Sequence, residues 1–141
     1  MWKKLQKISA RTVIVTGFDV CNRVGIAYNS GGTIYDAQDG LAYYNLYYNN
    51  ILARRMSWDD LVDNIDNGYR VFLGATTMSG GGHAAVIYGY IGSHSDDNNV
   101  ICWDPYMNAG TGGEIFVTYT DTYFTYGDGV GFNWDKTLSY Y

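Results

Sequence analysis

Two segments of the chain read Gly80-Gly81-Gly82-His83-Ala84-Ala85-Val86-Ile87-Tyr88-Gly89-Tyr90 and Val100-Ile101-Cys102-Trp103-Asp104-Pro105. Each apolar run is typical of a β-strand, and the polar residues between the two runs predict a turn. A histidine stands at the start of the first strand, and an aspartate stands at the end of the second. We therefore expect a β-hairpin whose open end brings these two side chains together.

The expected register of this hairpin places the histidine and the aspartate on the same face. If Tyr90 pairs with Asn99, then Asp104 lies opposite Ala85. Because side chains alternate along a strand with a period of two, His83 shares the face of Asp104. A carboxylate at that position accepts a hydrogen bond from one imidazole N–H, which fixes the tautomer and leaves the other nitrogen to act as a base.

Helical signals precede this hairpin, and further strand patterns surround it. Ser57 with Asp60, and Thr33 with Asp36, are capping patterns that predict helix starts. Helices followed by an antiparallel sheet are the order of the α+β class. We expect helices at 2–9, from 16 to about 25, from 33 through Tyr48 and from 57 to 68, a strand or extended connection at 11–15, and strands at 69–75, 83–91, 99–104, 114–119 and in the tail after 120.

Length and composition favour one globular domain over residues 1–141, because 47% of the residues are hydrophobic. The net charge of −5 argues against a nucleic-acid partner, since no basic patch neutralises many phosphates.

No run approaches the roughly 20 apolar residues of a membrane span. Residues 1–15 lack the apolar core and cleavage site of a signal peptide. The oligomeric state is left open.

The motifs around the hairpin resemble the papain-like cysteine peptidases of bacteria, nearest to the branch that includes the bacteriocin-leader peptidases. The resemblance rests on the glycine–histidine strand, on the strand ending in Asp-Pro, and on the helix and strand within 57–71. It extends over about residues 12–120. It implies a papain-like α+β fold, in which N-terminal helices pack on a twisted antiparallel sheet of about five strands.

The same resemblance implies an activity and a setting. The activity is hydrolysis of a peptide or protein substrate through a thiolate nucleophile, with no cofactor. The setting is a bacterium, with the protein secreted or in the cell envelope. His83 is the expected general base and Asp104 its orienting partner. Gly81, Gly82 and Trp103 are the expected substrate-binding residues, because a glycine run lets a substrate approach the backbone closely.

The chain departs from the family pattern at its beginning. The nucleophilic cysteine of the family is commonly followed by tryptophan at the start of the first helix, whereas here Trp2 follows Met1. We therefore expect a domain that is truncated at the N-terminus and inactive as it stands. Cys21 is a second candidate nucleophile, although it falls inside a predicted helix rather than at a helix N-terminus, where a thiol pKa is lowered.

Two further chemistries compete with this interpretation. Cys102 shares the face of Asp104, where packing in the core is favoured over a nucleophilic role. His83, His94, Cys102 and Asp104 are residue types that bind zinc, but no typical zinc-binding spacing connects them, and we expect no metal.

A non-catalytic module of the same fold that binds a peptide or a glycan is the alternative function. Tyr43, Tyr44, Tyr47 and Tyr48 are expected on nearly all sides of one helix, so some of them face outward. A contiguous patch of exposed tyrosines favours this alternative.

Overall fold

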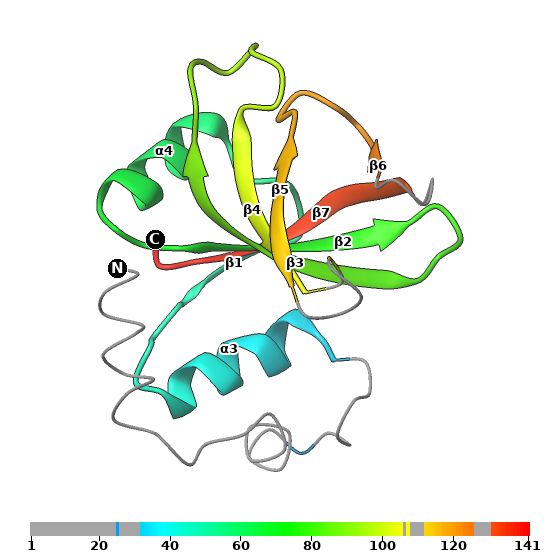
Figure 1. Ribbon diagram of the computed structural model, residues 1–141. Helices are drawn as coiled ribbons and strands as arrows, with labels where there is room; N and C mark the ends of the chain where they lie inside the picture. The colour runs from blue at the N-terminus through cyan, green and yellow to red at the C-terminus, as the bar shows by residue number, and fades with distance from the viewer. Residues whose placement is uncertain (1–24, 26–31, 106, 108–111, 126–130) are drawn as a thin grey trace.

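The computed structural model describes residue 25 and residues 32–105, 107, 112–125 and 131–141 (Figure 1). Within this part of the chain, two helices and a short strand precede the main antiparallel sheet, which confirms the α+β class. The elements are α3 (Ile34–Tyr43), β1 (Asn50–Leu52), α4 (Trp58–Asp66), β2 (Val71–Thr77), β3 (Gly82–Tyr90), β4 (Val100–Asp104), β5 (Gly113–Val117), β6 (Phe124–Thr125) and β7 (Gly131–Ser139).

Three predictions fall on the earliest part of the chain. They are the helix at 2–9, the segment at 11–15 and the helix from 16 to about 25, and apart from Gly25 they lie outside the described residues.

Both described helices begin at the residues that their capping patterns indicate. Thr33 caps α3 in a reciprocal capping box with Asp36. The Ser57 side chain caps α4 by accepting the backbone N–H of Asp60 at 3.2 Å. These bonds satisfy N–H groups that have no partner within the helix. The helix α4 ends before Gly68, whose φ of +82° is the left-handed conformation that closes many helices.

The helix α3 ends earlier than expected, which corrects the prediction that four tyrosines surround one helix. Asn45 adopts a φ of +59°, and Leu46 donates its N–H to the carbonyl of Leu41 at 3.0 Å. This is the hydrogen-bond pattern of a left-handed helix stop, which asparagine tolerates better than most residues. Tyr47 and Tyr48 therefore lie in the segment between α3 and β1. Tyr47 is exposed there, whereas Tyr48 is buried.

The sheet has the strand order β1-β7-β2-β3-β4-β5, and β6 pairs with β7. The five strands expected from the sequence are all present as β2, β3, β4, β5 and β7. The described residues add β1 and β6, which have three and two residues and are too short to show a period. Figure 1 shows β7, the last strand along the chain, inside the sheet rather than at its edge.

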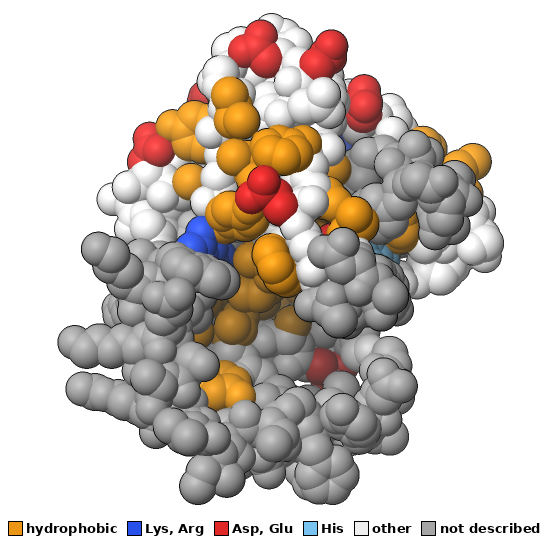
Figure 2. Space-filling view, in the orientation of Figure 1, with side chains coloured by type: hydrophobic (Ala, Val, Ile, Leu, Met, Phe, Trp, Pro, Cys, Tyr) orange, Lys and Arg blue, Asp and Glu red, His pale blue; other side chains and the backbone are white. Residues whose placement is uncertain are grey.

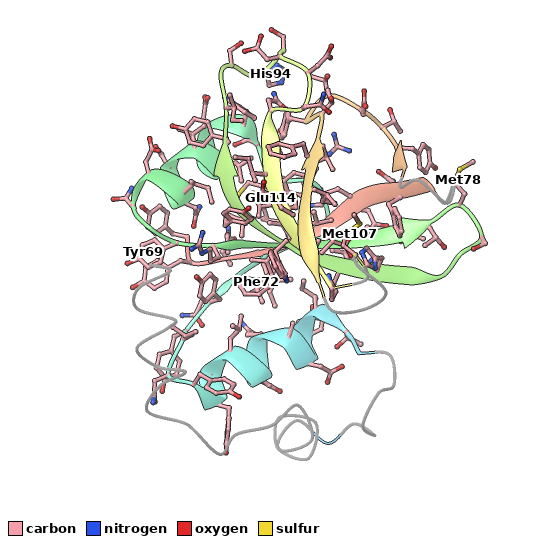
Figure 3. All side chains as sticks on the ribbon, in the orientation of Figure 1. Tyr69, Phe72, Met78, His94, Met107 and Glu114 are labelled. Atoms are coloured by element: carbon pink, nitrogen blue, oxygen red, sulfur yellow. The ribbon has the colours of Figure 1, made fainter. Side chains whose placement is uncertain are left out.

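The two faces of the sheet have different partners. One face carries the buried core, to which α4 contributes Leu61, and Trp134 of β7 lies in the same cluster as residues of β5. The sheet therefore curls around this inner face. The outer face carries Phe72, which packs against Tyr48 near α3 (Figure 3), and the half-exposed rings of Trp103 and Phe116. Hydrophobic side chains gather over the sheet in Figure 2.

No helix in the part of the chain described by the structure is long and apolar enough to cross a membrane.

Candidate active site

The strands β3 and β4 bring His83 and Asp104 together. His83 is the second residue of β3, and Asp104 is the last residue of β4, where Pro105 follows and cannot donate to the sheet. The Nε2 atom of His83 and the Oδ2 atom of Asp104 are 2.5 Å apart. The hydrogen-bonded pair that the sequence predicts is present on one face of the hairpin.

The pair is withdrawn from water. The side chain of His83 is 2% exposed and that of Asp104 is not exposed at all. A buried carboxylate is costly unless it accepts hydrogen bonds, so the imidazole N–H compensates part of that cost. With Nε2–H donating to Asp104, the neutral ring carries no proton on Nδ1.

Small and aromatic side chains hold the imidazole in place. His83 pairs across the sheet with Ala75 of β2, and Ala85 follows it on the same face. These small side chains leave room for the ring. The ring of Phe132 from β7 lies 4.6 Å from the imidazole, measured between centroids, at an angle of 42°. Phe132 could not be predicted from the sequence, because no local pattern relates β7 to the start of β3.

A β-bulge explains how the predicted register holds near the pair. At the turn, Tyr90 pairs with Val100 rather than with the expected Asn99, so the register there is wrong by one residue. The register shifts between Ile87 and Gly89, and from that point Ile87 pairs with Cys102 as predicted. One extra residue in β3 therefore restores the pairing that sets Asp104 beside His83.

Of the two cysteines of the chain, Cys102 lies within the described residues and Cys21 does not. Cys102 is fully buried within the core cluster, as the packing interpretation predicts. Burial, and secondarily the nearby charge of Asp104, raises the pKa of its thiol, so Cys102 stays protonated and is a poor nucleophile. Cys21 lies outside the described residues.

The expected substrate-binding residues lie in two places. Gly81 and Gly82 are exposed at the turn between β2 and β3, directly before His83. Gly80 beside them has a φ of +90°, so the turn itself requires a glycine there. Trp103 lies on the outer face, against Gly112, because neighbours along a strand point to opposite faces. The structure does not bring Trp103 together with the pair.

The zinc interpretation gains no geometric support. His94 lies at the tip of the loop between β3 and β4, and Figure 3 places it far from Met107, which follows Asp104 by three residues. Among the described residues, no group of three or more His, Cys, Asp or Glu side chains gathers closely enough to hold a metal ion.

Comparison with known proteins identifies the family. The family model described as the Peptidase_C39 like family matches residues 12–129, which is most of the chain. The chain belongs to the Peptidase_C39 like family. This family is part of the papain-like cysteine peptidase superfamily, and the α+β architecture agrees with a papain-like fold. The curated proteins include no match to the chain.

Membership of the Peptidase_C39 like family implies a peptide substrate. Both His83 and Asp104 fall inside the matched residues.

Proposed function

We propose that the domain carries the acid–base half of a cysteine-peptidase site, in which His83 is the general base and Asp104 orients it. The observation that supports this proposal is the 2.5 Å contact between His83 Nε2 and Asp104 Oδ2 on a buried sheet face. A carboxylate in that position keeps the imidazole in one tautomer and stabilises the imidazolium when it forms.

The proposed reaction is acyl transfer to a thiol followed by hydrolysis. His83 Nδ1 takes the thiol proton, and the thiolate attacks the carbonyl carbon of the peptide bond. The C–N bond breaks, the imidazolium gives its proton to the departing amine, and a thioester remains. Water then attacks the thioester, with His83 as the base again, and releases the free acid and the thiol.

The nucleophile has two candidate sources. Within the 141 residues, Cys21 is the candidate, because the raised pKa of buried Cys102 argues against that thiol. The alternative is a cysteine outside these 141 residues, as the resemblance implies. In that case the 141-residue chain does not hydrolyse peptides by itself.

Alkylation of the native chain with iodoacetamide at pH 7, followed by peptide mass spectrometry, separates these sources. If Cys21 is the nucleophile, it reacts at least about tenfold faster than a free cysteine, because the His83 base raises its thiolate fraction. His83→Ala then lowers the rate to that of an ordinary thiol. Cys102 is the internal control, and it reacts only after unfolding in urea.

A Cys21 that reacts at the same ordinary rate with and without His83 removes Cys21 as the nucleophile. The pair is tested independently by ¹⁵N NMR of the imidazole. We expect the neutral ring to be protonated at Nε2 in the native chain, and this preference to be lost in Asp104→Ala. A native ring protonated at Nδ1 overturns the assignment of His83 as the base, whatever the source of the thiol.

A further inference from the structure

A cavity of about 530 Å³ lies away from the His83–Asp104 pair. Its walls come from the segment after α3, the end of α4 and the residues after β7. Figure 3 shows Tyr69, which lines it, on the opposite side of the molecule from Met107, which follows Asp104 by three residues. The volume falls within the range of about 300–1,000 Å³ that is usual for small-molecule sites.

Four tyrosines form the aromatic part of the walls. Tyr69 and Tyr140 stack face to face, with ring centroids 3.8 Å apart and an angle of 2° between their planes. Tyr48 packs edge-on against Tyr140 from the buried side. Tyr140 is 41% exposed and Tyr47 is 57% exposed. Because neighbouring rings hold the stacked pair in position, a ligand meets a preformed aromatic surface and loses little affinity to side-chain ordering.

Three asparagines line the same cavity: Asn45, Asn49 and Asn67. All three are exposed. Each amide offers two donors and an acceptor. The amide of Asn67 donates to the carbonyl of Asp63 at 2.8 Å, which fixes its orientation. The lining residues within the described chain include no charged side chain, so the cavity suits a neutral ligand that both donates and accepts hydrogen bonds.

These walls match the chemistry of a carbohydrate. A sugar ring has an apolar C–H face that packs on an aromatic ring, and its hydroxyl groups donate and accept hydrogen bonds at once. A second hollow of about 660 Å³, to which Asp39 contributes a carboxylate that accepts hydrogen bonds, shares Asn45 and Tyr47 with the first, so the hollowed surface continues beyond the first cavity. We propose that the Tyr69–Tyr140 cavity binds a neutral oligosaccharide, with the stacked rings against a sugar face and the asparagine amides on the hydroxyls.

A proline-rich peptide is the competing ligand, because such peptides also dock in grooves lined by aromatic residues. Proline carries no backbone N–H, so a proline-rich segment offers mainly carbonyl acceptors. Such a peptide makes little use of the amide oxygens of three asparagines. The mixture of donors and acceptors in these walls therefore favours hydroxyl groups over a proline-rich backbone.

The test titrates the full chain with maltohexaose, cellohexaose and the hexamer of N-acetylglucosamine, and separately with a decamer of proline. Binding is followed by ¹H–¹⁵N NMR and isothermal titration calorimetry. We expect one oligosaccharide to shift the signals around Tyr69 and Tyr140 saturably. Tyr140→Ala is expected to weaken its binding about tenfold, because the stacked aromatic surface is lost.

Matched variants separate binding from folding. Tyr140→Phe keeps the ring and retains binding within about threefold, whereas Asn49→Ala removes one amide and weakens it about fivefold. Tyr35→Ala is the control, because this tyrosine is 63% exposed and does not line either hollow. If Tyr140→Ala fails to fold, Asn49→Ala decides. Saturable binding of the proline decamer alone, or no saturable shift with any oligosaccharide at millimolar concentration, overturns the proposal.

Discussion

The carboxylate of Asp104 has no exposure to water, so replacing it reveals what the contact with His83 contributes to stability. Asp104→Ala leaves the Nε2–H of a buried imidazole without this acceptor, and we expect it to lower the free energy of unfolding by about 1–3 kcal/mol. Asp104→Asn retains an amide oxygen as acceptor and is expected to lose less. Urea denaturation at pH 7 measures both. Equal losses in the two variants contradict a role for the hydrogen bond.

The buried phenol of Tyr48 makes stability depend on alkaline pH. Burial raises the pKa of Tyr48 from 10.0 to about 12, although the N–H of Arg70, which donates to its oxygen, acts in the opposite direction. Because the folded chain holds this proton more tightly than the unfolded chain, the stabilisation is complete below pH 10. It is lost as the pH rises from about 10 towards 12.

The matched variant is Tyr48→Phe, which keeps the ring against Phe72 and removes the titrating group. We expect the free energy of unfolding of this variant to fall less steeply than that of the wild type between pH 10 and pH 12. Urea denaturation across this range provides the measurement. If the free energy of unfolding falls equally steeply with pH in the two proteins, the proposed effect of Tyr48 is ruled out.

At the scale of single residues, the sequence predicts the contact between His83 and Asp104 because both residues belong to one hairpin. Alternation along two neighbouring strands then decides which side chains meet. The ring of Phe132 against His83 could not be predicted, since it arrives from a strand far along the chain. The same alternation explains why Trp103 is exposed on the other face of the sheet. Its position directly before Asp104 in the sequence had suggested that it lies near the pair.

Among the elements, α4 depends on the backbone conformation of Gly68 at its C-terminal end. At a φ of +82°, any residue with a Cβ atom is strained, so we expect Gly68→Ala to destabilise the protein by about 1 kcal/mol. Gly82→Ala is the control, because Gly82 lacks a left-handed φ and a Cβ atom there meets nothing within 4 Å. Thermal unfolding compares the two variants. Similar losses in both contradict the conformational explanation.

The helix starts and the strands of five or more residues could be predicted, because capping residues and apolar alternation are local signals. The end of α3 was missed, since Asn45 is a weaker stop signal than glycine. The strand β1 pairs with β7, and three residues of sequence carry no period that reveals this. The bulge in β3 was missed for a similar reason, because Tyr88 continues the apolar run without interruption.

For the whole molecule, β7 joins parts of the sheet that are distant in sequence. It pairs with β2 on one side and with β1 on the other, and Phe132, Trp134 and Leu138 are buried. Deletion of residues 131–141 therefore exposes the core, and we expect circular dichroism and NMR to show an unfolded chain. Deletion of Tyr141 alone removes its hydrogen bonds with Asn64 and Ser139 and its ring contacts, but it removes no part of a strand and leaves a folded protein. A folded chain without β7 contradicts this view.

The position of β7 within the sheet illustrates what sequence patterns leave undetermined. The tail after 120 predicts a strand, but its neighbours depend on which hydrophobic faces it buries, and that is a property of the assembled sheet. Sequential strands usually lie side by side, which favours a place for β7 beside β5. The curled sheet places β7 between β1 and β2 instead.

The bulge between Ile87 and Gly89 separates the pairing near His83 from the pairing near the loop that His94 occupies. A bulge accommodates one extra residue locally, so the strand pairing at one end of the hairpin can change without changing the pairing at the other end. A foreign peptide inserted at Asp97, in this exposed loop, is consequently tolerated without moving the imidazole. The loop is therefore a suitable attachment point for a tag or a reporter.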